Sequence, residues 1–226
     1  MTLTGAQVQR YSRHLLLPQV GKEGQERLLA GAVLIAFPPE AQGTAEALAA
    51  YLAAAGVGRI GWWPLGPPVR TPGSLAGLLG AFGAAGPADA VRAINPDARL
   101  EVLGGEAGAR RWDGRVALLI GGAEALAGMF RAAGMAVIRG ERRGLSGAVL
   151  GAGAVLGEGA VPADDRAPAW FGESEDEALP TAPAEGALGA LLAAAAIRAL
   201  LEGGRAGSAG FDFGRGRLWG RAAAAP

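Results

Sequence analysis

The run Ala32-Val-Leu-Ile-Ala36 is apolar at every position, which predicts a strand buried on both faces of a parallel sheet. The Ala- and Leu-rich segment Thr44–Ala55 follows and stops at Gly56, a pattern typical of a helix with a glycine stop. Arg59-Ile-Gly-Trp-Trp63 then predicts a second strand. A strand, a helix and a strand in this order are one unit of a doubly wound sheet.

The rest of the chain continues this alternation. Further strands are expected at residues 99–103, 116–120, 135–139 and 149–156, and a terminal hairpin at 210–220. Further helices are expected over residues 4–30, with a break at Pro18, and at 75–82, 89–94, 126–133 and 184–202. An exposed acidic loop is expected over 172–183.

This order predicts an α/β, Rossmann-like fold: a mostly parallel, doubly wound sheet with helices on both faces and C-terminal antiparallel strands. One domain is expected over residues 1–226. Its parts would be an N-terminal helical segment (1–30), a Rossmann-like half (31–140) and a closing part (141–226) with the acidic loop and the longest helix.

Composition excludes several kinds of site. The 226 residues carry no net charge, so the chain has no excess of basic residues of the kind that binds nucleic acid. The absence of cysteine excludes disulfides and zinc-thiolate sites, and the single histidine, His14, makes a histidine metal site improbable. No signal pattern and no uninterrupted membrane-length apolar run occurs, so a cytoplasmic protein without membrane contact is expected.

Four blocks stand in an order that resembles a known family. They are residues 10–19 (RYSRHLLLPQ), 24–28 (GQERL), 33–36 (VLIA) and 51–58 (YLAAAGVG). Their order resembles the ThiF/MoeB/HesA family, relatives of the ubiquitin-activating enzymes, which use ATP to adenylate the C-terminal glycine of a ubiquitin-like protein. Weaker likenesses follow in the same order at 91–96, 142–147, 179–186 and 211–213.

The turn that would hold ATP departs from this family. The resemblance implies a glycine-rich loop whose backbone N–H groups approach phosphate. Here the positions read Phe37, Pro38, Pro39, Glu40 and, later, Gly43. Proline has no N–H to donate and the glutamate would repel an anion, so the loop is interpreted as degenerate.

Other positions that the resemblance marks are also changed. Trp62 and Trp63 stand where an acidic residue would hold the ribose; they would plug the vacant pocket or line a remodelled one. No lysine lies near the expected phosphate position, since Lys22 is the only lysine of the chain. Glu124 is the one possible remnant of the magnesium-supporting acid. Loss of ATP, magnesium and zinc binding is therefore expected, with no cofactor.

The resulting hypothesis is a catalytically inactive, protein-binding subunit in ubiquitin-like-protein or sulfur-transfer metabolism. It would form a homodimer, or a heterodimer with an active ThiF/MoeB-like paralogue, and a ubiquitin-like sulfur carrier is a possible further partner. The resemblance implies that Arg13, with Arg10, would reach the nucleotide of the other subunit, a role that suits guanidinium; the alternative is that both are solvated residues of an inherited helix. Two alternatives stay open: residual adenylation of a ubiquitin-like protein, and a ligand-sensing or structural protein that uses the remodelled pocket.

Overall fold

The computed structural model describes residues 2–67, 86–121, 123–151 and 181–221. Its helices are α1 (Gly5–Arg10), α2 (Ser12–Leu15), α3 (Gly21–Ala30), α4 (Gln42–Ala55), α7 (Pro87–Ile94), α8 (Gly105–Arg110), α9 (Ala127–Ala132) and α10 (Ala182–Leu201), with short 3-10 helices η1 (Pro39–Ala41) and η2 (Ala123–Leu126). Its strands are β1 (Ala32–Phe37), β2 (Arg59–Pro64), β3 (Arg99–Val102), β4 (Val116–Ile120), β5 (Ala136–Arg143), β6 (Ser146–Leu150), β7 (Ser208–Asp212) and β8 (Arg217–Arg221).

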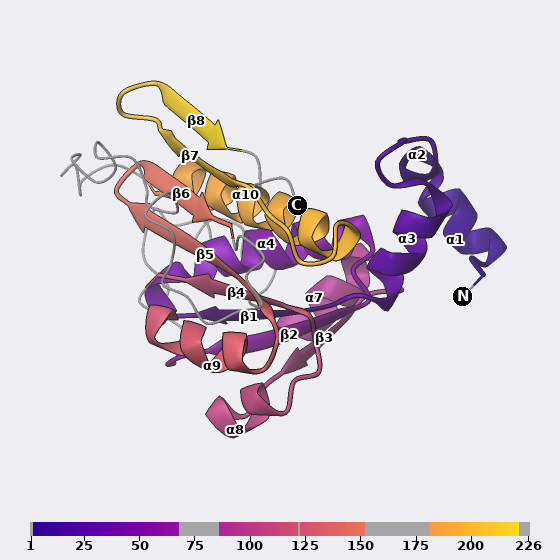
Figure 1. Cartoon of the computed structure of the whole chain (residues 1–226), viewed down its shortest axis with the longest axis horizontal. Helices are drawn as coiled ribbons and strands as arrows, with labels where there is room; N and C mark the ends of the chain where they lie inside the picture. The colour runs from indigo at the N-terminus through magenta and orange to yellow at the C-terminus, as the bar shows by residue number, and fades with distance from the viewer. Residues whose placement is uncertain (1, 68–85, 122, 152–180, 222–226) are drawn as a thin grey trace.

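The described strands form one eight-stranded sheet in the order β3-β2-β1-β4-β5-β6-β7-β8 (Figure 1). Neighbours from β3 to β5 are parallel, and those from β5 to β8 are antiparallel. The predicted fold class is confirmed. The direction of the strand order reverses between β1 and β4, and in sheets of this kind ligands bind beyond the carboxyl ends of the strands at such a point.

Hydrophobic side chains cover both faces of the sheet. On one face, Leu48 and Leu52 of α4 and Leu188 and Leu192 of α10 pack with the inward residues of β1, β2 and β4. On the other face, Phe130 of α9 packs with alternate residues of the same strands. Strands buried on both sides explain the continuously apolar sequences of β1 and β4.

The two longest helices, α4 and α10, lie side by side on one face (Figure 1). A Cβ atom at Gly189 of α10 would lie 2.8 Å from the Ala47 Cβ and 2.9 Å from the Thr44 carbonyl oxygen. The close approach therefore requires glycine. Among the described helices, α10 alone is long and apolar enough to cross a membrane by length and composition. Since α10 packs on α4, β5 and β6, it is a core helix of the fold.

The hairpin of β5 and β6 differs from the prediction. β5 continues through Arg143, and β6 begins at Ser146 rather than near Val149. Gly144, with φ of 54°, permits a two-residue turn that pairs Arg143 directly with Ser146. The charged residues Glu141, Arg142 and Arg143 lie at the half-exposed end of β5, where a strand tolerates them.

Three further points concern the predicted elements. α8 was not predicted, because its six residues carry little hydrophobic periodicity. α10 begins at Ala182, inside the expected acidic loop, with Pro183 in its first turn. Proline is tolerated there, because the backbone N–H groups of the first turn have no hydrogen-bond partner within the helix. The helix expected at 75–82, residues 152–156 of the expected strand and residues 172–180 of the expected loop lie outside the described residues.

Candidate functional site

The turn from β1 to α4 lies at the reversal of the strand order. Pro38 is extended, with φ of −77° and ψ of 162°, and the Ala41 N–H donates to its carbonyl oxygen at 3.0 Å. Glu40 is exposed in the 3-10 turn between them. Gly43 is buried in the first turn of α4, so it is part of a helix rather than of an open loop.

Both proline rings pack against neighbouring turns. A Cβ atom at Gly121, after β4, would lie 3.7 Å from the Pro38 Cγ. A Cβ atom at Gly66, after β2, would lie 2.9 Å from the Pro39 Cγ. The turn thus presents hydrocarbon at a place where phosphate-binding turns present backbone N–H groups.

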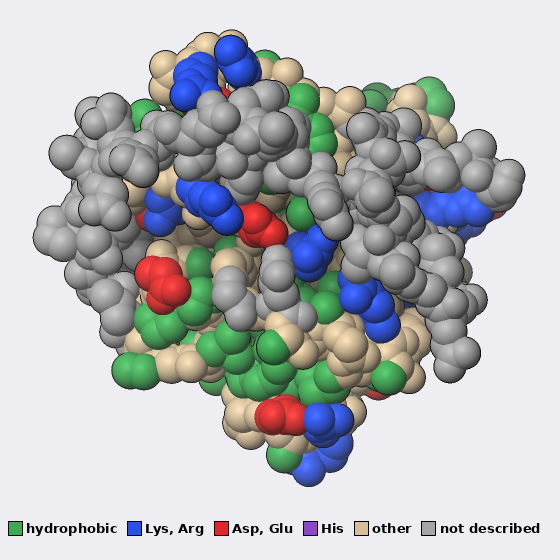
Figure 2. All heavy atoms as spheres, turned by 60° about the vertical axis from the view of Figure 1, so that its left-hand side comes forward, with side chains coloured by type: hydrophobic (Ala, Val, Ile, Leu, Met, Phe, Trp, Pro, Cys, Tyr) green, Lys and Arg blue, Asp and Glu red, His purple; other side chains and the backbone are tan. Residues whose placement is uncertain are grey.

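The carboxyl ends of the parallel strands point toward the left-hand side of Figure 1, and Figure 2 brings that side forward. In the coloured part of this face, basic and acidic side chains are interspersed beside hydrophobic ones (Figure 2). No patch of a single charge sign dominates the coloured atoms of this view.

α4 and α10 each bury a glutamate near their first turn. Glu46 is 4% exposed, and its Oε1 accepts from the Gln42 side-chain amide at 2.8 Å. Glu185 is 1% exposed; its Oε1 accepts from the Thr181 hydroxyl at 2.8 Å and lies 3.9 Å from an Arg142 nitrogen. The sequence analysis missed both residues, because one glutamate in an Ala-rich helix carries no sign of burial.

Trp62 and Trp63 do not line one pocket. They are consecutive residues of β2, so their side chains point to opposite faces of the sheet. Trp62 packs against Phe37, with ring centroids 4.5 Å apart, and Trp63 packs against Phe130 at 6.3 Å. Their exposed fractions are 6% and 5%, so each ring is part of the core on its own side.

Glu124, the possible remnant of a metal-supporting acid, lies in η2 after β4; its side chain is outside the described set. Among the side chains that the structure describes, no group of three or more His, Asp or Glu residues is placed to hold a metal ion.

The two N-terminal arginines differ in their surroundings. Arg10, at the end of α1, forms an ion pair with Asp97, in the turn between α7 and β3. Arg13, in α2, is exposed, and within the described residues no hydrogen bond or ion pair of its guanidinium is found. The structure therefore separates two residues that the sequence analysis had grouped.

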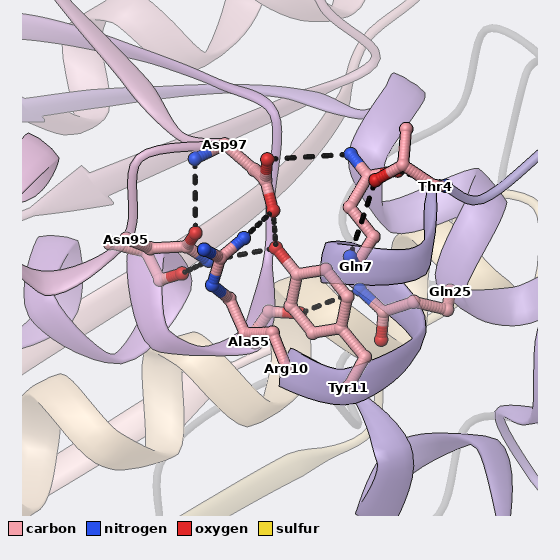
Figure 3. A network of polar contacts seen from close by, with 9 residues as sticks. Thr4, Gln7, Arg10, Tyr11, Gln25, Ala55, Asn95 and Asp97 are labelled. Carbon is pink, nitrogen blue, oxygen red and sulfur yellow. Dashed lines mark hydrogen bonds and ion pairs between the residues drawn. The ribbon is translucent and has the colours of Figure 1, made fainter.

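A polar network anchors residues 4–16, which we call the N-terminal arm (Figure 3). The Tyr11 hydroxyl donates to the Asp97 Oδ2 at 3.0 Å and accepts from the Asn95 side-chain amide at 2.9 Å. The same Asn95 nitrogen donates to the Ala53 carbonyl at 2.7 Å, and the Gln7 amide donates to Asp97 at 3.4 Å. Burial raises the pKa of Tyr11 above its usual value of about 10, and the Asp97 charge adds to this effect.

The network joins three of the sequence blocks that were recognised separately. Tyr11 comes from block 10–19, Ala53 from block 51–58 and Asn95 from 91–96. Gly56, at the end of α4, has φ of 85°, and a Cβ there would lie 2.7 Å from the Tyr11 ring. These blocks therefore include the contacts that dock the arm, and Asp97 was missed because its partners are distant in sequence.

A second contact fixes the end of the arm. The His14 Nδ1 lies 2.8 Å from the Gln25 Oε1, and the Gln25 amide nitrogen donates to the Ala55 carbonyl at 3.2 Å. Because the Gln25 nitrogen is the donor to Ala55, its oxygen is the acceptor for His14. His14 is thus a packed residue of the arm.

No protein-family model matches the sequence. The chain is 51% identical over 59 residues to the adenylyltransferase and sulfurtransferase MOCS3 of Bos taurus, which is 26% of this chain and 12% of that protein. It is 46% identical over 61 residues to the sulfur carrier protein adenylyltransferase of Thermus thermophilus, 27% of this chain and 21% of that protein. The probable adenylyltransferase/sulfurtransferase MoeZ of Mycobacterium tuberculosis is 48% identical over 59 residues, 26% of this chain and 14% of that protein.

Solved structures extend the likeness over nearly the whole chain at the level of the fold. PaaA matches with a TM-score of 0.69 and 17% identity, over 98% of this chain and 75% of that one. MccB of E. coli matches with a TM-score of 0.63 and 14% identity, over 96% of this chain and 70% of that one. The chain is thus similar in sequence to these adenylyltransferases over about a quarter of its length, and similar in fold to PaaA and MccB over almost all of it.

Proposed function

We propose that this chain is a non-adenylating relative of the E1-like adenylyltransferases that acts by binding protein. It would be an accessory subunit, as a homodimer or with an active paralogue, in ubiquitin-like-protein or sulfur-transfer metabolism. The observation that carries the proposal is the turn after β1, where the packed rings of Pro38 and Pro39 take the place of N–H donors.

The charges around this turn also support the loss of nucleotide binding. ATP requires positive charge and backbone donors, and its adenylyl transfer requires neutralisation of charge at the reacting phosphate. Glu40 is exposed at the turn, and Glu46 is buried in the following helix. Lys22, the only lysine, lies in α3, which is docked at the opposite end of α4. Removal of one electrostatic donor alone commonly lowers a rate about 100-fold or more.

A retained scaffold supports an accessory role. The arm is docked by a complete polar network while Arg13 stays exposed. A guanidinium that is always charged can bind phosphate oxygens bidentately, which suits a contribution to the nucleotide site of a partner subunit. The similar protein of Thermus thermophilus is a sulfur carrier protein adenylyltransferase, so a ubiquitin-like sulfur carrier is the proposed third component.

The first test asks whether the isolated chain uses ATP. Calorimetric titration with magnesium-ATP and an ATP–pyrophosphate exchange assay with a sulfur carrier protein are both expected to give no signal. The Thermus thermophilus sulfur carrier protein adenylyltransferase serves as the positive control under the same conditions. Binding or exchange by this chain would overturn the proposal in favour of a residual adenylyltransferase.

The second test asks whether the chain assists a partner. The chain and the E1-like adenylyltransferase of the same cell are co-expressed, and sedimentation is used to look for a complex at micromolar concentration. The complex is expected to form, and Arg13→Ala is expected to slow the partner's ATP–pyrophosphate exchange without unfolding this chain. A failure to associate would remove the heterodimer, and sedimentation of this chain alone would then test the homodimer.

A further inference from the structure

The Asp97 carboxylate accepts hydrogen bonds from three side chains of the N-terminal arm. The Gln7 amide, the Arg10 guanidinium and the Tyr11 hydroxyl all reach it. These residues are spaced i, i+3 and i+4, so they lie on one face of the helical arm. Within α1 and α2, Gln7 is the one buried side chain, and Tyr11 between them is 1% exposed. The two buried side chains, Gln7 and Tyr11, are thus both donors to Asp97, and the exposed Arg10 adds its charge at the rim of the contact.

Asn95 holds this carboxylate in place. Its side-chain oxygen accepts from the Asp97 backbone N–H at 3.0 Å, while its nitrogen donates to Tyr11 and to the Ala53 carbonyl. Asn95 is 1% exposed, and these bonds use its side-chain oxygen and both amide hydrogens. The turn between α7 and β3 is therefore a built receptor for the arm.

Arg13 lies between the two anchors of the arm. Tyr11 precedes it by two residues and is bound to Asp97, and His14 follows it directly and is bound to Gln25. With its neighbours fixed on both sides, the backbone of Arg13 is fixed while its side chain remains exposed. Arg10, by contrast, has its charge paired within the chain.

We infer that Asp97, supported by Asn95, is a positioning residue that presents Arg13 to the partner subunit; this inference rests on the proposed function. A docked arm holds the backbone of Arg13 at one position relative to the partner subunit, whereas in a released arm Arg13 would occupy many positions. Charge-assisted hydrogen bonds such as that of Arg10 and Asp97 are the strong members of the class, so loss of the carboxylate charge shifts the docking equilibrium about 10- to 100-fold.

The first experiment tests the docking on the chain alone. Hydrogen–deuterium exchange compares the wild type with Asp97→Asn, which keeps the shape of the side chain and removes its charge. The amides of residues 5–15 are expected to exchange about 10- to 100-fold faster, with β1 and β4 unchanged. Asp113→Asn is the matched control, since Asp113 also pairs with an arginine, Arg59 at 2.7 Å, but away from the arm. An unchanged exchange rate of the arm in Asp97→Asn would overturn the inference.

The second experiment uses the complex with the adenylyltransferase and separates positioning from stability by a double-mutant cycle. Arg13→Ala is expected to lower the partner's kcat for ATP–pyrophosphate exchange about 100-fold, and Asp97→Asn about tenfold. If Asp97 acts through Arg13, the double variant is no slower than Arg13→Ala alone. Additive losses would mean that Asp97 acts by another route, which contradicts the inference.

The two experiments distinguish the failures. A full rate in Arg13→Ala overturns the role of this residue in trans, and with it the proposed function in its heterodimer form. Faster exchange of the arm in Asp97→Asn would then still show that Asp97 docks the arm, but the docking would not serve to position Arg13.

Discussion

Tyr11 and Asp97 are 86 positions apart in the sequence, yet the Tyr11 hydroxyl donates to the Asp97 Oδ2 at 3.0 Å. This contact joins the first helical turns of the chain to the turn before β3. It lies outside the turn after β1, residues 37–43, which the sequence resemblance marks as the phosphate-binding turn. With the Gln7, Arg10 and Asn95 contacts, it makes the docking site of the arm a connected polar network.

Replacement of Tyr11 by phenylalanine removes a donor to Asp97 and leaves one Asn95 N–H without its partner. The buried amide then bears a desolvation cost, so a loss of about 1–3 kcal/mol in the free energy of unfolding is expected. Urea denaturation measures it. Tyr51→Phe is the control, because Tyr51 is 53% exposed, and a change within about 0.5 kcal/mol is expected there. Equal effects in the two variants would contradict the role of the hydroxyl.

The same hydroxyl predicts a dependence of stability on alkaline pH. Burial raises the pKa of Tyr11 in the folded chain, so the unfolded chain loses this proton first as the pH rises. The contribution of Tyr11 is complete below about pH 10, the unfolded pKa, and is lost as the pH rises from there through the folded pKa. Urea denaturation at pH 8 and pH 10.5 should show a larger fall for the wild type than for Tyr11→Phe. Parallel falls would show that Tyr11 is not the group responsible.

Gly56→Ala should destabilise the fold for two reasons. The backbone at Gly56 has φ of 85°, and an added Cβ would lie 2.6 Å from the Gln25 Nε2 and 2.7 Å from the Tyr11 ring. A loss of about 3 kcal/mol is expected, from backbone strain and overpacking together. Gly203→Ala, with φ of 70° and nothing within 4 Å, isolates the strain and should cost about 1 kcal/mol. Thermal unfolding measures the loss of stability in both variants. Similar losses would mean that the Tyr11 and Gln25 side chains move aside without cost.

Gly189→Ala tests the contact between α4 and α10. The new methyl group would lie 2.8 Å from the Ala47 Cβ, so the helices must separate, at a cost of about 1–3 kcal/mol. Gly128→Ala is the control within a helix: nothing lies within 4 Å, and helix propensity alone should stabilise by about 0.5–1 kcal/mol. Chemical denaturation should therefore give changes of opposite sign. Stabilisation by both substitutions would show that the helix pair adapts without cost.

Much of the fold could be predicted, for reasons that particular residues show. The apolar runs of β1 and β4 are buried on both faces, and Gly56 ends α4 where expected. The start of β6 could not be predicted, because it follows from the pairing of Arg143 with Ser146 across a two-residue turn, which the local hydrophobic pattern does not show. Trp62 and Trp63 show the same limit, since adjacency in sequence suggested one pocket and the strand placed the rings on opposite faces.

By itself, the sequence determined the strands β1 to β5 and the helices α4, α7 and α9, because the hydrophobic period and the glycine stops that mark them act within a few residues. It also determined that the turn after β1 lacks two N–H donors, since Pro38 and Pro39 lack them in any fold. Only the tertiary structure decided which arginine of the arm is paired and which is exposed. That choice depends on where the Asp97 carboxylate lies, and its position follows from packing between segments more than 80 residues apart.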